Sequence, residues 1–154
     1  MSGKCCAFGH RNSSLKLCAD MRSIINDLIE NDGVDEFLTY GMGNFDKAFV
    51  SAVINARKTY KNIRLVLVAF GDITKLRDNQ EYYKNIYDDI IVPFAVSGSG
   101  NNTSAADAND YLIKQCDYII SGVFGNTGKA YSAVSCAKRN GKTVIPLNGK
   151  AKGR

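Results

Sequence analysis

The sequence predicts an α/β protein built on a single doubly wound, mostly parallel sheet with helices on both faces. Two observations support this fold class. Short apolar runs alternate with segments of helical spacing along the whole chain, which is typical of repeated strand–helix units. The run IRLVLVAF at 63–70 is apolar except for Arg64, as expected for a strand buried on both faces of a parallel sheet.

The first strand and helix follow from the N-terminal residues. The apolar segment KCCAF at 4–8 predicts a strand, and the polar loop GHRNSS comes directly after it. Apolar residues then recur with helical spacing from Leu15 to Ile29, which predicts a helix. Ser13 or Ser14 can cap its first turn, and the turn residues NDG at 31–33 end it.

The next two strands flank the most regular helix. EFLTY at 36–40 predicts a second strand, and the glycine loop GMGNFD at 41–46 follows it. From Phe45 to Tyr60 the apolar residues fall on one helical face, so a helix is expected before the third strand at 63–70. The polar and aromatic stretch at 71–89 shows no clear period and predicts a loop with at most one helical turn, before a short strand at 89–94.

The C-terminal half repeats the same alternation. After the loop SGSGNNTS, a helix is expected at about 105–115, a strand at 116–124, the loop GNTGK and a helix at 130–140. Gly141 ends that helix, and TVIPL at 143–147 forms the closing strand. We find no internal repeat and no linker, so we expect one domain over 1–148 and a separate basic tail at 149–154.

Composition and charge limit the function classes. The chain has 154 residues, is 45% hydrophobic and carries a formal charge of +5, of which Lys150, Lys152 and Arg154 in the tail supply three. The remainder is nearly neutral and its cations are scattered among acids, which disfavours nucleic-acid binding. No apolar run approaches the ~20 residues that span a membrane, and the N-terminus lacks the apolar stretch of a secretory signal, so a cytoplasmic protein is expected.

The cysteines predict no metal site and no cofactor. Cys5, Cys6, Cys18, Cys116 and Cys136 are odd in number and show no C-x-x-C spacing. Most of them fall inside apolar segments, so buried reduced thiols are the favoured interpretation.

Three of the predicted loops follow strands and therefore meet at the carboxyl edge of the sheet, where ligands of open α/β sheets bind. Glycines there let backbone amides approach a phosphate or ribose, cations supply charge, and amides or hydroxyls supply neutral hydrogen bonds. The candidate ligand-binding residues of these loops are Gly9, His10 and Arg11; Gly41, Met42, Gly43, Asn44, Phe45 and Asp46; and Gly125, Asn126, Thr127, Gly128 and Lys129.

Several of these residues also have purely structural interpretations. A glycine-rich turn serves a tight strand–helix connection with or without a ligand. His10 can be a packed residue, a ligand contact or a general base, and Asp46 can cap the helix that follows it or accept a ribose hydroxyl. Phe45 and Phe124 suit the core or a pocket wall better than a stacking platform. Neither G-x-G-x-x-G nor the P-loop pattern is present.

An ordered set of segments carries a family resemblance. CCAFGHR, YGMGNFDKAF, IRLVLVAF, YDDIIVP and CDYIISGVFGNTGKAYSAVSCAKRNGKTVIPL together resemble the SLOG superfamily, in particular its small bacterial and phage branch of YpsA-like proteins. The resemblance spans essentially the whole chain. That superfamily includes the LOG phosphoribohydrolases, the DNA-processing protein DprA and the ligand-sensing domain of Thoeris defence effectors.

The resemblance implies a Rossmann-like fold and a nucleotide or ADP-ribose-type ligand bound across the loops. Residues 9–11 match the first motif of the family, Gly41, Gly43, Phe45 and Asp46 match the second, and 125–128 match the last. LOG enzymes carry P-G-G-x-G-T-x-x-E, whereas FGNTGKAYSA offers no acid. YpsA-like proteins usually have an Arg-Asn pair at the start of the penultimate helix, where this chain has only Asn109. The pocket is carried over, with Asn109 included, and the LOG catalysis is not.

Three functions from different classes remain open. The first is non-catalytic binding, for sensing or sequestration, of a nucleotide-derived small molecule, including a role in bacterial or phage defence signalling. The second is a nucleoside-phosphate N-ribohydrolase that uses Asp46 or His10 for acid–base work, although it lacks the expected acid. The third is an adaptor that contacts protein or nucleic acid through its tail and the tyrosines at 82, 83 and 87. Helices rich in glycine and alanine also suggest a homo-oligomer.

Overall fold

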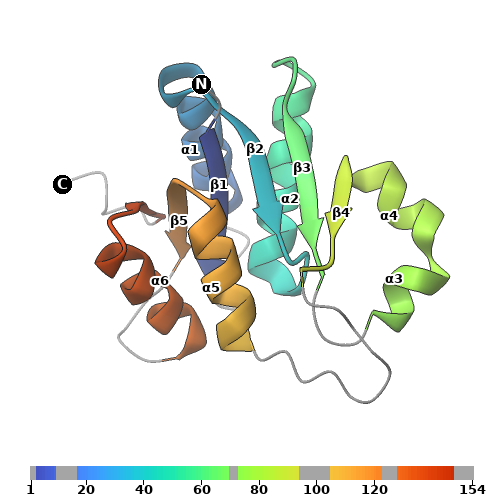
Figure 1. Cartoon of the computed structure of the whole chain (residues 1–154). Helices are drawn as coiled ribbons and strands as arrows, with labels where there is room; N and C mark the ends of the chain where they lie inside the picture. Colours follow the sequence, from blue (N-terminus) through green and yellow to red (C-terminus); the bar gives the residue numbers. More distant parts are fainter. Residues whose placement is uncertain (1–2, 10–16, 70–72, 94–104, 123–127, 148–154) are drawn as a thin grey trace.

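The computed structural model describes residues 3–9, 17–69, 73–93, 105–122 and 128–147. Its centre is a six-stranded sheet in the order β4-β3-β2-β1-β5-β6, and every neighbouring pair is parallel (Figure 1). The strands are β1 (Gly3–Gly9), β2 (Val34–Thr39), β3 (Arg64–Val68), β4 (Asp89–Ile91), β5 (Tyr118–Gly122) and β6 (Thr143–Pro146). This confirms the predicted doubly wound, Rossmann-like α/β class.

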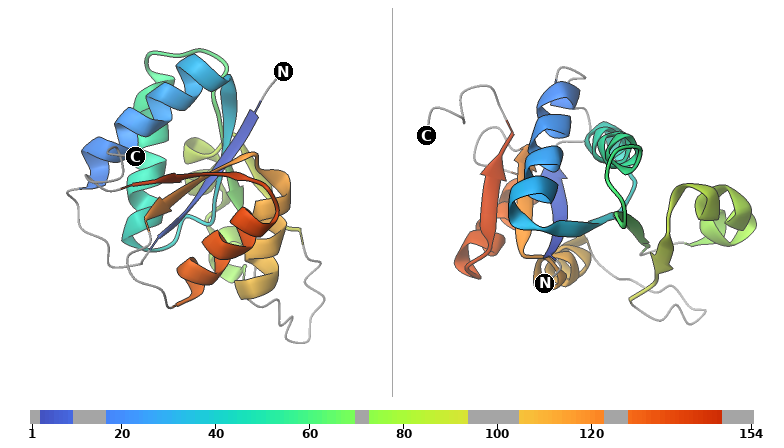
Figure 2. Two further views of the ribbon diagram at one scale, coloured as in Figure 1. Left: turned by 90° about the vertical axis from the view of Figure 1, so that its left-hand side faces the viewer. Right: turned by 90° about the horizontal axis from the view of Figure 1, so that it is seen from above.

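Helices cover both faces of the sheet, as the two turned views show (Figure 2). On one face lie α1 (Leu17–Asp32) and α2 (Gly43–Arg57), and on the other lie α5 (Ala105–Gln115) and α6 (Lys129–Arg139). Neighbouring residues of β1 alternate between the two cores: Cys5 and Ala7 face α1 and α2, whereas Cys6 and Phe8 face α5 and α6. The continuously apolar strands are therefore explained by burial on both sides.

The segment at 71–89 differs from the expected loop. It contains two short helices, α3 (Thr74–Asp78) and α4 (Gln80–Ile86), which lie beside the β4 edge of the sheet (Figure 1). Neither helix has a fully buried residue, so no apolar period marks them in the sequence. Leu76, Tyr83 and Ile86 are partly buried against the core beneath α2.

Polar contacts fix this segment to the sheet. Arg57, in the last turn of α2, donates from Nη1 to Asp88 at 2.8 Å and from Nη2 to the Ile86 carbonyl at 3.0 Å. The same Asp88 carboxylate accepts the Leu65 amide of β3 at 2.7 Å. The end of α4 is therefore tied both to a helix and to a central strand, which holds the preceding tyrosines in place.

Among the described residues, no helix is both long and apolar enough to cross a membrane. The expected domain bounds and the expected cytoplasmic location remain predictions. The tail at 149–154 lies outside the residues that the structure describes.

Candidate functional site

The carboxyl ends of the central strands meet at one edge of the sheet. Gly9, the last residue of β1, is paired in register with Gly122, the last residue of β5. Strands β2 to β4 lie on one side of β1, whereas β5 and β6 lie on the other. The strand order therefore reverses between β1 and β5, and ligands of such sheets bind at this point.

Part of the predicted site lies outside the described residues: His10, Arg11, Gly125, Asn126 and Thr127. Their participation stays a prediction. For Lys129 only the backbone is described, as the first residue of α6. Gly128 is the residue before that helix, with φ at 99°, and no described atom lies within 4 Å of the position that a Cβ would take there. Among the described residues, none therefore covers the start of α6 at Gly128.

The ring of Phe45 occupies the space beside Gly9 and Gly122, where other residues would have a side chain. A Cβ at Gly9 would lie 2.4 Å from Phe45 Cγ, and one at Gly122 would lie 2.2 Å from Phe45 Cε1. The ring is 2% exposed. Phe45 therefore packs across the ends of β1 and β5, in agreement with the core interpretation, and these two glycines make room for protein as well as for any ligand.

The β2–α2 connection is a tight glycine turn. Gly41 has φ at 70° and Gly43 has φ at 82°, the left-handed region that favours glycine. The Gly41 amide donates to the hydroxyl of buried Thr39 at 3.0 Å. Because this turn is short, the N-terminus of α2 lies at the carboxyl edge of the sheet, directly after β2. Asn44 is exposed in the first turn of the helix.

Asp46 folds back on the start of its own helix. Its Oδ2 accepts the backbone amide of Met42, the N-cap residue, at 3.0 Å. The Met42 side chain itself makes no capping bond within the described part of the chain. The cap interpretation of Asp46 therefore has a contact behind it, and the ribose interpretation remains a prediction.

Substitution of Asp46 separates these interpretations. Asparagine keeps a side-chain oxygen that can accept the Met42 amide, so Asp46→Asn should leave the melting temperature within about 2 °C of the parent. If Asp46 also accepts a ribose hydroxyl, AMP binding should weaken about tenfold, because a charged acceptor is lost. Thermal unfolding and calorimetric titration measure the two effects. Unchanged AMP affinity would mean that Asp46 only caps the start of α2 and does not bind the ligand.

Asn109 is joined to the end of β2 by a residue that the sequence did not single out. Tyr40 donates its hydroxyl to Asn109 Oδ1 at 2.6 Å, which connects β2 to α5 across 69 positions. Burial raises the pKa of Tyr40 far above its usual value, and the charge of the Asp46 carboxylate adds to this. The phenol is therefore a neutral donor that orients the Asn109 amide.

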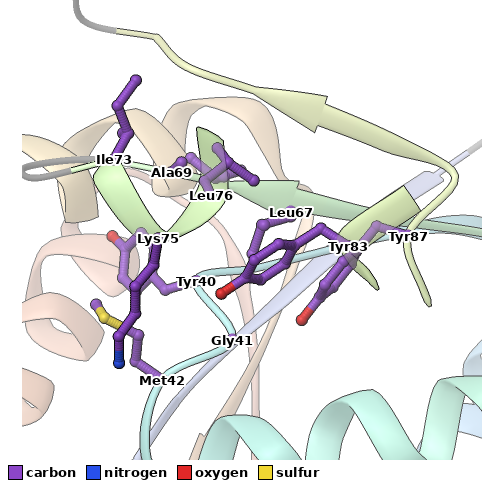
Figure 3. A pocket seen from close by; sticks show the side chains of 11 residues that line it. Tyr40, Gly41, Met42, Leu67, Ala69, Ile73, Lys75, Leu76, Tyr83 and Tyr87 are labelled. Carbon is purple, nitrogen blue, oxygen red and sulfur yellow. The ribbon is translucent and has the colours of Figure 1, made fainter. Parts of the chain in front are cut away.

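A pocket of about 280 Å³ opens beside this turn (Figure 3). It lies between the ends of β2 and β3 on one side and the α3–α4 segment on the other. It is lined by residues 40–42, by residues 67–69, and by Ile73, Lys75, Leu76, Tyr83 and Tyr87.

The pocket combines aromatic and apolar side chains with a comparable share of polar surface. The Tyr83 and Tyr87 rings are nearly parallel, at 20°, with centroids 6.4 Å apart. Burial, with a contribution from the Asp46 charge, raises the pKa of Tyr87 to about 12, so its hydroxyl stays neutral. Lys75 supplies a cation at the exposed side.

Sequence reasoning placed Gly41 and Met42 in the site but missed the pocket's other wall. The tyrosines were considered only as a covering of the sheet edge or as an adaptor surface. Their spacing was the available signal: Tyr83 in α4 and Tyr87, directly after the helix, are four positions apart and both buried at least in part. Tyr82 is 62% exposed.

The cysteines fit the expected thiol interpretation. Cys5, Cys6 and Cys116 are fully buried, and Cys136 is partly exposed; all four are free thiols. Burial raises the pKa of Cys5 and of Cys6, which keeps both protonated and unreactive. The side chain of Cys18 is not among those described. No group of three metal-ligating side chains occurs in the part of the chain that the structure describes.

Comparisons with known proteins bear on the fold. No family model and no curated protein matches this chain. Among solved structures, the X-ray structure of DNA processing protein A (DprA) from Streptococcus pneumoniae is similar, with a TM-score of 0.70 and 11% identity over 98% of this chain and 55% of that chain. The chain thus spans about half the length of that protein. At this identity the likeness shows a shared Rossmann-like fold.

Proposed function

We propose that this protein is a SLOG-type domain that binds a nucleotide or ADP-ribose-type small molecule, without catalysis, at the carboxyl edge of its sheet. The observation that carries the proposal is the glycine turn at 41–43, which leads into the N-terminus of α2 directly beside a partly aromatic pocket. Sensing or sequestration in bacterial or phage defence signalling is the setting that the SLOG resemblance implies, with a homo-oligomer as the working form.

The two halves of such a ligand have matching environments. The first-turn amides of α2 and the partial positive charge of its N-terminus favour phosphate or ribose oxygens. Gly41 and Gly43 keep side chains away from that approach. The neighbouring pocket offers apolar and aromatic surface that suits the rest of the ligand.

Binding without hydrolysis is favoured by the lining of the pocket. Within the described residues that line it there is no carboxylate, and the nearby Asp46 is engaged with the Met42 amide. A ribohydrolase needs an acid–base group within hydrogen-bond reach of the glycosidic bond. We therefore infer that the ligand is held rather than cleaved.

Calorimetric titration of the full chain with AMP, ADP-ribose, NAD and cyclic ADP-ribose tests the proposal. We expect heat of binding for at least one of them at tens of micromolar protein, and chromatography after incubation should find free base released only at the buffer rate. Flat traces for all four would contradict the binding function, and enzymatic base release would favour the hydrolase instead.

Arg11→Ala is the sharpest variant for this proposal. If the ligand carries phosphate, the guanidinium forms a charge-assisted fork with it, and its loss should weaken binding by about 1.5–3 kcal/mol. Arg22→Ala is the matched control, because Arg22 is exposed on α1. Equal affinity of both variants and the parent would remove Arg11 from the site.

The structural similarity to DprA suggests one further ligand for the titration, which is DNA. The name of DprA describes a DNA processing protein, so single-stranded and double-stranded DNA are both titrated in parallel. We expect weak binding that disappears at moderate salt, because the charge outside the tail is nearly neutral. Salt-resistant DNA binding that survives deletion of residues 149–154 would favour a nucleic-acid function for the folded part.

A further inference from the structure

The pocket has two unlike sides. In Figure 3, Tyr83 and Tyr87 stand on one side with Leu67 behind them, and Lys75 and Met42 are drawn on the other, with Gly41 in the turn between. The aromatic side is well anchored, because Tyr87 is only 8% exposed and the end of α4 is tied to Arg57. Lys75 and Met42 are exposed and can adjust to an occupant.

The volume limits what can enter. Sites for drug-sized ligands measure about 300–1,000 Å³, and this pocket, at about 280 Å³, lies just below that range. It therefore has room for one ring system of a nucleotide and not for a whole dinucleotide. The rest of the ligand would have to lie outside it.

The chemistry of the lining selects the kind of ring. The Tyr83 and Tyr87 rings stack on each other and Tyr87 is buried, so a flat ring would lie against the partly exposed Tyr83 ring. Leu67 and Leu76 add apolar surface there. The ammonium of Lys75 can only donate hydrogen bonds, and neutral tyrosine hydroxyls also donate. A flat ring with acceptor atoms on its edge, such as a purine, meets both requirements.

We propose that this pocket is the base subsite of the protein, and that Tyr83 is the residue that reads the flat ring of a purine-type ligand. The inference rests on the proposed nucleotide-binding function, since it assigns the base of that nucleotide to this pocket. The ribose and phosphate then extend from the pocket past Gly41 toward the N-terminus of α2.

The test compares AMP with ribose 5-phosphate, which lacks the ring. In Tyr83→Ala, AMP affinity should fall about tenfold, in the range found when an aromatic residue stacked on a base is truncated, whereas ribose 5-phosphate should bind as it does to the parent. Tyr60→Ala is the control, since Tyr60 lies beyond the C-terminal end of α2 and does not line the pocket. Tyr83→Phe keeps the ring and should stay within about threefold of the parent.

Thermal unfolding first verifies that each variant is folded, and Tyr83→Leu replaces the alanine variant if that one melts early. An unchanged AMP affinity, or an equal loss for AMP and ribose 5-phosphate, overturns the base subsite while leaving the proposed function standing. If AMP does not bind the parent, saturation-transfer NMR with millimolar adenine decides. A signal that Tyr83→Ala abolishes supports the subsite although the proposed function has failed, and no signal in the parent overturns the subsite.

Discussion

Replacing Gly122 with alanine is expected to lower the free energy of unfolding by about 3 kcal/mol, at the upper end of the usual cost of overpacking. The new Cβ would lie 2.2, 2.8 and 2.9 Å from three atoms of the Phe45 ring. The ring cannot turn aside freely, because it is buried and also lies against Gly9. For a chain of this length the melting temperature should fall by about 6–12 °C.

The matched control is Gly3→Ala, in the same sheet. A Cβ at Gly3 would meet Val34 Cγ2 at 3.4 Å, which is ordinary contact, so this variant should stay within about 0.5 kcal/mol of the parent. Urea unfolding followed by circular dichroism measures both. Equal stability of the two variants would mean that the Phe45 ring is not held over Gly122.

A double variant isolates the contact itself. Phe45→Ala alone should cost about 3–5 kcal/mol because it leaves a cavity. In the Phe45→Ala background the additional change Gly122→Ala should cost little, since the ring that it would strike is gone, which gives a coupling energy of about 3 kcal/mol. Additive losses would contradict the packing role of Phe45 at this edge.

This packing explains why the sequence predicts where Gly9 and Gly41 lie but does not predict what occupies the space beside them. The sequence predicts that the glycines after β1 and β2 sit at the carboxyl edge, and the strand ends confirm that for Gly9 and Gly41. It does not reveal that Phe45 from a later helix fills the space over Gly9. A missing side chain leaves room, and only the tertiary structure shows whether protein or ligand takes that room.

The same distinction separates the predicted elements from the missed ones. The strands and the four long helices have apolar residues at regular spacing because they bury one or both faces, so the pattern predicts them. Helices α3 and α4 have five and seven residues and no fully buried side chain. Their position depends on contacts such as Arg57 with Asp88, between residues 31 positions apart, which no local pattern encodes.

Gly41→Ala is the second variant with a large expected effect. Gly41 has φ at 70°, a conformation that costs an alanine about 1–2 kcal/mol, and its Cβ would lie 2.6 Å from the Tyr87 hydroxyl. Strain and collision together should lower the free energy of unfolding by about 2–4 kcal/mol. AMP affinity should fall as well, because Gly41 and Tyr87 both line the pocket.

Two further variants separate strain from collision. Gly141 has φ at 73° and no described atom within 4 Å of its Cβ position, so Gly141→Ala measures the strain alone, about 1–2 kcal/mol. In a Tyr87→Phe background the hydroxyl is absent, and the nearest atom to the Gly41 Cβ becomes Leu67 Cδ1 at 3.3 Å, the flexible end of a side chain. There Gly41→Ala should cost no more than Gly141→Ala. If the Tyr87→Phe background restores the stability of Gly41→Ala but not its AMP affinity, the turn at 41–43 must itself stay open for the ligand. If it restores both, the main role of Gly41 is to leave room for Tyr87 in the pocket wall.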